Sequence, residues 1–323
     1  MKEKTFSVSF LTYGNRLNYL FISLENVLVQ DFENIYIFAN GLEIEVLNSL
    51  HKWCEGKRIK ILESERNLGS AGGYKRLIKY IADNDSSDLV LLLDDDNALE
   101  PDFVDKARGL TFSDNVLYYF HRPDRVLPYK SYYESKPSLL LGAVNNFLGR
   151  SVFGGTYEDL SYDGDLLAAP YGGLLLSRSS LESNILPNDS FYLYADDYDY
   201  TFRLVMQKNF KILYTEVSLI HDLERSFHLV EKNSKKYSLF QNRYFKANKL
   251  QLYYSVRNQV FFSLKNSNSK FLFFVNMIVF YPIFILQFLF YLDFKRIFLF
   301  NSAIYSGFKM FKCEMVKRNN FEN

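Results

Sequence analysis

The first hundred residues alternate between short apolar runs and longer segments whose apolar residues recur at helical spacing. The apolar runs predict strands, and the spaced segments predict helices. Strands are expected at residues 6–11, 35–39, 58–62 and 88–93, and helices at residues 17–28, 43–53 and 72–82. Such alternation at short spacing is typical of parallel βαβ units. We therefore expect an α/β fold with a mixed, mostly parallel sheet flanked by helices.

The pattern is less regular beyond residue 115. Strands are expected at residues 168–176 and 212–220, and a helix is expected at residues 196–205. After about residue 230, basic residues alternate with Tyr and Phe, and residues 271–292 then carry no charge. The change in composition predicts two regions, a domain at residues 1–230 and a helical, aromatic region at residues 231–323.

Composition narrows the class of protein. The 323 residues carry a formal net charge of only +1, so no strong field favours nucleic acid. The two cysteines, Cys54 and Cys313, form neither a disulfide framework nor a zinc pattern.

An acidic run, Asp94-Asp95-Asp96, directly follows an apolar strand. If this stretch is extended, Asp94 and Asp96 point the same way and Asp95 faces elsewhere. Crowded carboxylates suit a hard divalent cation such as Mg²⁺ or Mn²⁺, and His221, at the end of a later strand, is a candidate third ligand. The alternative is a solvated acidic turn.

Two further stretches are candidate binding or catalytic sites. Residues 67–73 (NLGSAGG) lie between a strand and a helix, where backbone amides favour anions; an ordinary tight turn is the alternative. The predicted helix at 196–205 opens with Asp196, Asp197 and Asp199. Three carboxylates are more than the capping of a helix N-terminus requires. One of these carboxylates could act as a general base.

The order of these motifs resembles a known family. A first loop with Thr12 and Arg16, the NxGxAGG stretch, the acidic run, a Gly-Gly strand and an acidic helix start are followed by a histidine. This order is similar to that of bacterial family 2 glycosyltransferases with the GT-A (Rossmann-like) fold. The nearest branch holds galactofuranosyl- and rhamnosyltransferases. The likeness spans roughly residues 5 to 260, and Tyr253-Tyr254-x-x-Arg257-Asn258 also looks like that branch.

The resemblance implies a metal-dependent inverting glycosyltransferase of surface-glycan biosynthesis, with a nucleotide-sugar half at 1–100 and an acceptor half at 101–230. Asp94, Asp96 and His221 would hold Mn²⁺ or Mg²⁺, and Asp197 would be the catalytic base. Gly172, Gly173 and Asp196 would contact the donor sugar or the acceptor. The residues implied in nucleotide binding are Thr12, Arg16, Asn40, Asn67, Gly69, Arg76 and Asp95.

Two features bear on the donor. Many relatives carry an aspartate where this chain has Asn40, and an amide can still pair with a uracil edge. The unbroken Asp-Asp-Asp run tilts the donor toward UDP-galactofuranose, with dTDP-rhamnose as the alternative. A nucleotidyltransferase is discounted, because it would show a Gly-rich, Arg/Lys-bearing signature directly after the first strand. The alternative of another class is a non-catalytic membrane-associated scaffold.

The apolar stretch at residues 271–292 would be about 33 Å long as a helix, which is enough to cross a membrane. A single span would put the following basic residues outside, against the positive-inside tendency. We therefore expect a helical pair lying in the cytoplasmic leaflet of the bacterial cell membrane, near lipid-linked acceptors. A soluble helical subdomain, a dimer interface and a true span are the alternatives, and a homo-oligomer is left open.

Overall fold

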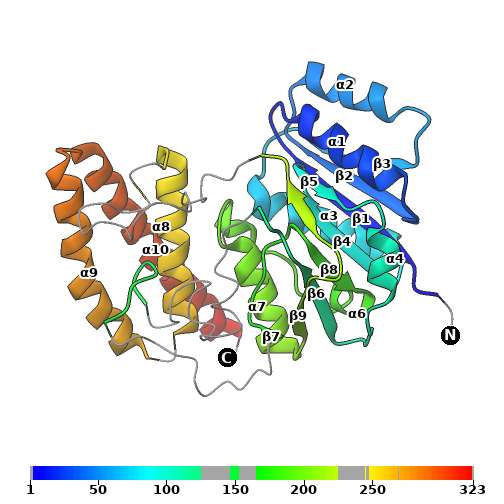
Figure 1. The fold of residues 1–323 in the computed structure, drawn as a ribbon. Helices are drawn as coiled ribbons and strands as arrows, with labels where there is room; N and C mark the ends of the chain where they lie inside the picture. Colours follow the sequence, from blue (N-terminus) through cyan, green and yellow to red (C-terminus); the bar gives the residue numbers. More distant parts are fainter. Residues whose placement is uncertain are drawn as a thin grey trace. The chain divides into compact units, whose positions relative to one another are not determined.

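The computed structural model describes residues 3–124, 146–152, 165–224, 244, 247–267 and 269–321. These residues fall into two compact units. The first contains the described strands and the helices up to α7 (Figure 1). The second contains α8, α9 and α10 together with residues 146–152 and 193–195.

The first unit is an α/β structure. Its strands are β1 (Phe6–Thr12), β2 (Asn34–Asn40), β3 (Ile59–Ser64), β4 (Leu89–Asp94), β5 (Asn97–Leu99), β6 (Val116–Phe120), β7 (Asp165–Leu166), β8 (Leu174–Ser177), β9 (Lys211–Thr215) and β10 (Ile220–Asp222). Its helices are α1 (Leu17–Leu28), α2 (Ile44–Cys54), α3 (Gly69–Asn84), α4 (Phe103–Arg108), α6 (Arg178–Leu181) and α7 (Asp196–Lys208), with a 3₁₀ turn η2 (Asp189–Phe191).

Among the described residues, eight strands form one sheet in the order β3-β2-β1-β4-β8-β6-β9-β7. The strands β1, β2, β3 and β4 run parallel, whereas β8 is antiparallel to both of its neighbours. The chain moves outward from β1 to β3 and then returns to place β4 on the other side of β1. The edge between β1 and β4 is therefore the topological switch point, where open α/β sheets bind ligands beyond the carboxyl ends of their strands.

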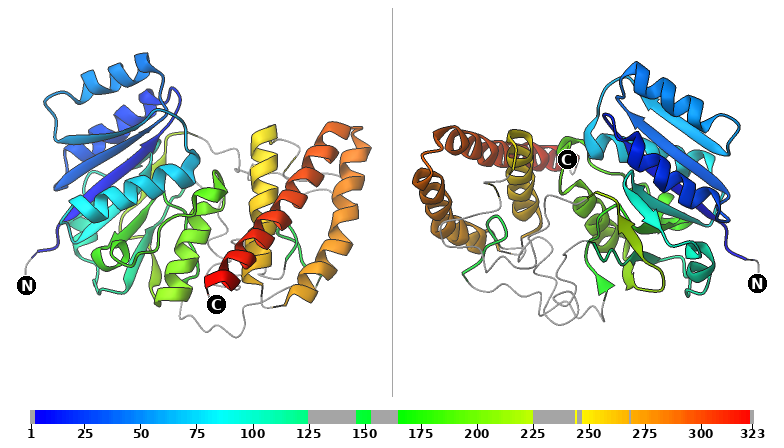
Figure 2. Two further views of the ribbon diagram at one scale, coloured as in Figure 1. Left: turned by 180° about the vertical axis from the view of Figure 1, so that it is seen from behind. Right: turned by 45° about the horizontal axis from the view of Figure 1, so that its top comes forward.

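Strand alternation divides the core between two faces of the sheet. Phe6, Val8 and Phe10 of β1 pack in one cluster with apolar residues of α1, α2 and α4. Leu11 instead lies against Gly73 of α3, so α3 covers the opposite face, as Figure 2 shows. Because both faces are covered, β4 reads as a continuous apolar run, and the two serines of β1, Ser7 and Ser9, are fully buried.

The predicted α/β fold with a mixed, mostly parallel sheet flanked by helices is confirmed, with three local corrections. The strand expected at 212–220 was wrong, because the chain forms β9 and then leaves the large sheet as β10 to pair with β5. The strand expected at 168–176 is shorter and begins at Leu174. The helix expected from Gly72 begins at Gly69, so the glycine-rich stretch forms its first turns.

The second unit is helical. It comprises α8 (Lys249–Asn266), α9 (Lys270–Phe290) and α10 (Phe294–Phe321). α8 starts at a capping box, in which the side chains of Asn248 and Gln251 each accept the other residue's backbone N–H. Aromatic side chains such as Phe273 and Phe300 fill the core of the unit. The basic and aromatic segment expected before residue 244 lies outside the described residues.

Helix α9 buries its two amide residues, Asn276 and Gln287, and exposes a stripe of apolar residues. Asn276 is fully buried and accepts a hydrogen bond of 2.8 Å from the backbone of Val152, and Gln287 is also buried. The exposed stripe of α9 consists of Phe271, Phe274, Ile278, Pro282, Leu286 and Phe290. Among the described helices, α9 alone is long and apolar enough to cross a membrane, and 28% of its most apolar window is buried. This arrangement is the reverse of that of a helix on a water-facing surface.

Candidate functional site

The site is built where β1 and β4 end side by side. Leu11 of β1 is in register with Asp94, so Thr12 and the acidic run lie at the same edge of the sheet. Asp94 ends β4, and Asp95 and Asp96 form a tight turn into β5. The extended conformation expected for the acidic run was therefore wrong. The turn is held by Asn97, whose Oδ1 accepts a 3.0 Å hydrogen bond from the Asp94 backbone N–H.

Thr12 and Arg16 both bind Asp95. The Thr12 hydroxyl donates to Asp95 Oδ2 at 2.9 Å, and Arg16 Nε donates to Asp95 Oδ1 at 2.8 Å. Burial raises the pKa of Asp95 to about 6, against the lowering effect of Arg16. Arg16 also lies 3.4 Å from Asp96 Oδ2. Thr12 and Arg16 thus anchor the acidic turn to the end of β1.

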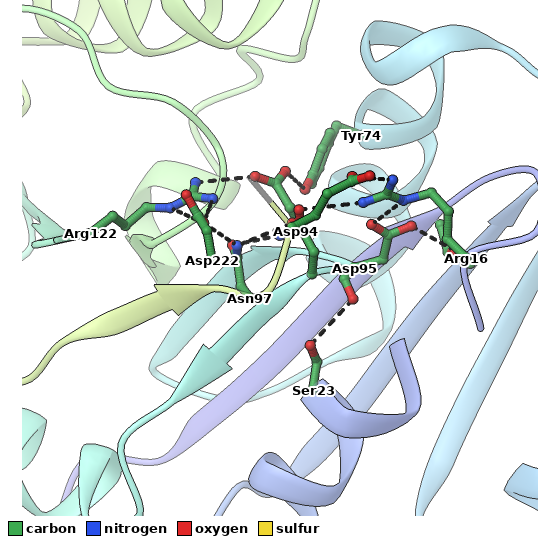
Figure 3. Close-up of polar contacts among 11 residues, drawn as sticks. Arg16, Ser23, Tyr74, Asp94, Asp95, Asn97, Arg122 and Asp222 are labelled. Carbon is green, nitrogen blue, oxygen red and sulfur yellow. Dashed lines mark hydrogen bonds and ion pairs between the residues drawn. The ribbon is translucent and has the colours of Figure 1, made fainter. Parts of the chain in front are cut away.

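A fully buried arginine, which the sequence analysis did not identify, holds the other side of the turn. Arg122 Nη1 lies 3.1 Å from Asp94 Oδ2, and Arg122 Nε donates to Asp222 Oδ1 at 2.9 Å (Figure 3). Asn97 Nδ2 donates to the same Asp222 oxygen at 2.9 Å. Because a buried guanidinium is costly unless it is paired, Asp222 and Asp94 keep it in place. The cluster thus joins the ends of β4, β5 and β10 and the residues that follow β6.

His221 and Asp222 point in opposite directions from β10, as successive strand residues do. Asp222 faces Arg122 and Asn97, whereas His221 Nδ1 lies 3.1 Å from Asp124 Oδ2. The described hydrogen bonds thus connect Asp222 to the acidic turn through Arg122 and Asn97, and connect His221 to Asp124.

The Gly-Gly pair before β8 packs against this cluster. A Cβ at Gly172 would collide with Arg122 Nη1, Asp94 Oδ2 and Asn97 Oδ1. Gly173 has φ +93°, a conformation that favours glycine, and its N–H donates to Leu92 O at 2.9 Å. The closeness of Gly172 to Asp94 places this pair beside the acidic turn.

The cluster holds more negative than positive charge. The guanidinium groups of Arg16 and Arg122 are shared by five carboxylates, those of Asp94, Asp95, Asp96, Asp222 and Glu224. Burial, followed by repulsion from Asp94 and Asp95, raises the pKa of Asp96 to about 7. Five carboxylates against two guanidiniums leave a formal charge of −3 when all are ionised, so a divalent cation would offset most of the excess negative charge.

Oxygen donors of this kind fit Mg²⁺ or Mn²⁺. Among the described residues, no group of three or more His, Cys, Asp or Glu side chains is arranged to hold a metal ion. Mg²⁺ is commonly bound by one or two carboxylates and completes its shell with water and phosphate oxygens. Asp94 and Asp96 therefore fit a cation that also binds a diphosphate.

Two buried tyrosines lie between the acidic turn and the start of α7. The Tyr74 hydroxyl donates to Leu93 O at 3.0 Å and lies 3.4 Å from Asp94 Oδ1. The Tyr74 and Tyr171 rings are 3.9 Å apart between centroids. Burial raises the pKa of Tyr171 well above its usual value, and the charges of Asp196 and Asp197 raise it further. The pair of Tyr74 and Tyr171 thus lies near both the acidic turn and the carboxyl groups that open α7.

Asp196 and Asp197 occupy the first turn of α7 in different environments. Asp196 is 2% exposed and accepts hydrogen bonds of 2.9 and 2.8 Å from the Ser70 hydroxyl. Burial, together with the Asp197 charge, raises the pKa of Asp196 well above its usual value. Asp197 is half-buried, and its Oδ1 accepts the Tyr198 backbone N–H at 2.9 Å. Asp197 is thus the more accessible of the two carboxyl groups.

The amides at the start of α3 already have protein acceptors. Leu68 N–H donates to Asn40 Oδ1 and Gly69 N–H donates to Asn67 Oδ1, both at 2.8 Å. Asn40 Nδ2 also donates to Gly69 O at 3.0 Å. Arg76 is exposed on α3. Asn40, Asn67 and the backbone of Gly69 thus hold together the loop that leads into α3.

Asn258 of the second unit is also structural. It is fully buried in α8 and donates to the carbonyl groups of Leu193 and Tyr194 at 2.7 and 2.8 Å. The Tyr253-Tyr254-x-x-Arg257-Asn258 motif thus includes a side chain that fixes the backbone of residues 193–195, within its own unit.

Comparisons with known proteins bear on the fold. No family model and no curated protein sequence matches the chain. Among solved structures, Staphylococcus aureus TarS 1–349 in complex with UDP-GlcNAc has a TM-score of 0.52 at 15% identity, over 93% of this chain and 79% of that one. GalNAc-T7 with UDP, GalNAc and Mn²⁺ has a TM-score of 0.48 at 10% identity, over 82% of this chain and 48% of that one. The TarS likeness agrees with the GT-A-type architecture.

Proposed function

We propose that this protein is a glycosyltransferase that moves a sugar from a nucleotide sugar to a hydroxyl group of a surface-glycan acceptor. The observation that carries the proposal is the acidic turn at Asp94–Asp96, which lies at the switch point of a GT-A-type sheet. The excess negative charge of this turn suits a divalent cation and the diphosphate that such a cation would accompany. The likeness of the fold to TarS in complex with UDP-GlcNAc supports a UDP-sugar donor.

In the proposed reaction, Asp197 takes the proton of the acceptor hydroxyl. The hydroxyl oxygen forms a bond to the anomeric carbon from the face opposite the leaving group, so the configuration inverts. The bond from this carbon to the diphosphate oxygen breaks, and the nucleoside diphosphate leaves with the bonding electrons. General base catalysis of this kind contributes typically about 10²- to 10⁴-fold.

A divalent cation, when bound, offsets the negative charge that develops on the leaving diphosphate. Asp94 and Asp96 would hold it, and Arg122 and Asp222 fix the Asp94 carboxylate. His221 is left out of the proposed ligand set because its ring engages Asp124.

The donor is tested with a panel of UDP-galactofuranose, UDP-GlcNAc, UDP-glucose and dTDP-rhamnose, by measuring nucleotide release with Mn²⁺ and with a chelator. We favour UDP-galactofuranose, on the resemblance carried by the Asp-Asp-Asp run. The expected result is Mn²⁺-stimulated release from one UDP-sugar. Turnover of dTDP-rhamnose alone would select the rhamnosyl alternative. If calorimetry detected no nucleotide binding and no donor turned over, the scaffold alternative would replace the enzyme.

We further propose that α9 and α10 bind the cytoplasmic surface of the cell membrane. The exposed stripe of α9 is wholly apolar, and Phe298 and Tyr305 of α10 are 78% and 71% exposed. Along the same stripe of α10 follow the exposed residues Lys309 and Lys312, which match anionic headgroups. Helices that lie in the interface combine such an apolar face with flanking cations.

Binding to vesicles tests this location. We expect Ile278→Asp and Phe298→Asp each to weaken co-sedimentation with phosphatidylglycerol-containing vesicles by about 10-fold or more, since each places a charge on an apolar face. Val29→Asp is the matched control, because Val29 is 80% exposed on the first unit. Unchanged vesicle binding in the α9 and α10 variants would refute the proposal. So would a lipid-free dimer that these substitutions dissociate in light scattering.

A further inference from the structure

The first turn of α3 packs directly against the chain that leads into α7. The backbone N–H of Ala71 donates to Tyr192 O at 3.2 Å. A Cβ at Gly69 would collide with the same Tyr192 carbonyl, and Gly69 has φ +70°. Only glycine therefore permits this approach of two backbones. The glycine at this position serves contact with Tyr192.

The next residue of the turn, Ser70, extends the contact to Asp196. The Ser70 hydroxyl lies 2.9 and 2.8 Å from the two carboxyl oxygens of Asp196, which is 2% exposed. A hydrogen bond in such a dry environment is stronger than one in water, and its loss leaves a buried polar group unpaired. Three successive residues of α3, Gly69 to Ala71, thus hold both Tyr192 and Asp196.

The backbone between these two contacts is strained. Tyr192, Tyr194 and Ala195 have φ values of 62°, 68° and 61°, in the left-handed region that residues other than glycine rarely adopt. Each such residue costs on the order of 1 kcal/mol or more and persists only where its surroundings hold it. Asp197 directly follows this segment, so its direction depends on how firmly the segment is held.

We propose that Gly69–Ala71 is a positioning platform for Asp197, and that Ser70 and Asp196 are positioning residues rather than donor-binding residues. This inference rests on the proposed function, because it takes Asp197 as the general base. It assigns the glycine-rich stretch to the acceptor side of the reaction, through protein contacts that are already made.

Substitution of Ser70 tests the platform. We expect Ser70→Ala to lower kcat by about 10- to 100-fold with the donor KM within about 3-fold, since a misplacement of about 1 Å can cost this much. Ser70→Thr keeps the hydroxyl and is expected to restore most of kcat. Asp196→Ala should match Ser70→Ala, and the double variant should be no slower than the slower single variant, because the two side chains act as one unit. A higher donor KM at unchanged kcat would overturn the proposal and place Ser70 on the donor.

Lys75→Ala is the matched control. Lys75 joins α3 to Asp189 through an exposed ion pair of 2.8 Å. This contact connects α3 to the segment that precedes Tyr192, and it does not involve residues 192–197. We expect it to leave kcat unchanged. Hydrogen exchange of the peptide spanning Tyr192–Arg203 provides a readout independent of turnover, and Ser70→Ala is expected to accelerate it. If the wild type turned over no donor, the proposed function would fail, whereas equal exchange in Ser70→Ala and wild type would overturn the platform itself.

Discussion

Replacement of Asp197 by Asn is expected to lower kcat by about 10³-fold or more, because the amide cannot take the acceptor proton. The donor KM and the affinity for UDP should stay near the wild-type values, since Asp197 is not among the residues at the ends of β1 and β4. The half-buried position of Asp197 and the equal size of Asn favour an intact fold. Steady-state kinetics together with calorimetric UDP binding measure both quantities.

Asp199→Asn is the control from the same helical turn. The Asp199 carboxylate is buried and pairs with Arg203 Nε at 2.7 Å, so its loss should lower the melting temperature and leave kcat within about threefold. If instead Asp197→Asn turned over normally, the base would be another residue, and the acidic start of α7 would serve only to cap the helix.

The order of the early strands and helices could be predicted because β1, β2 and β4 are buried along nearly their whole length. β4 reads as a continuous apolar run, and β1 interrupts its apolar residues only with the buried residues Ser7 and Ser9 before Thr12. The change from β9 to β10 could not be predicted. Residues 212–220 form one apolar run, yet Ile220–Asp222 pair with Asn97–Leu99, more than a hundred residues away in the chain. Local periodicity contains no information on such a partner.

Only part of the candidate site could be predicted, because some of its residues are brought together by tertiary contacts alone. The location of the acidic turn follows from its place after an apolar strand, but its partners Arg122 and Asp222 depend on tertiary packing. A signal for Arg122 was present, since a charged residue closely follows the apolar strand Val116–Phe120. Sequence alternation alone also could not decide whether His221 or Asp222 faces the acidic turn. That choice depends on the register of β10.

The start of α3 was predicted too late in the sequence, and the reason lies in its glycines. Each glycine disfavours a helix by roughly 1 kcal/mol, so sequence pattern places the start of the helix after the glycines. In the structure, Gly69 is required by the close backbone of Tyr192 and Gly73 packs against the Leu11 side chain, and this packing outweighs the propensity. A run of glycines at a predicted βα junction therefore marks close approach, which can be to protein as well as to phosphate.

Replacement of Asp96 by Asn is expected to weaken Mn²⁺ binding, measured by electron paramagnetic resonance in the presence of UDP, by about 10-fold or more. Turnover at fixed Mn²⁺ should fall by about 10³-fold, and a chelator should abolish turnover of the wild type. The physical reason is the excess of carboxylates over guanidiniums in the turn, which a divalent cation offsets.

The neighbouring residue supplies the matched variant. Asp95 is 3% exposed and is bound by Thr12 and Arg16, so Asp95→Asn should change Mn²⁺ affinity by less than about threefold. In the metal-free protein at pH 8, Asp96→Asn should raise the melting temperature. The raised pKa of Asp96 means that its ionised form is disfavoured in the folded state, and the substitution removes that repulsion.

Equal loss of Mn²⁺ affinity in both variants would show that the turn is needed as a whole rather than through Asp96. Undiminished turnover with a chelator would remove the cation from the proposed reaction.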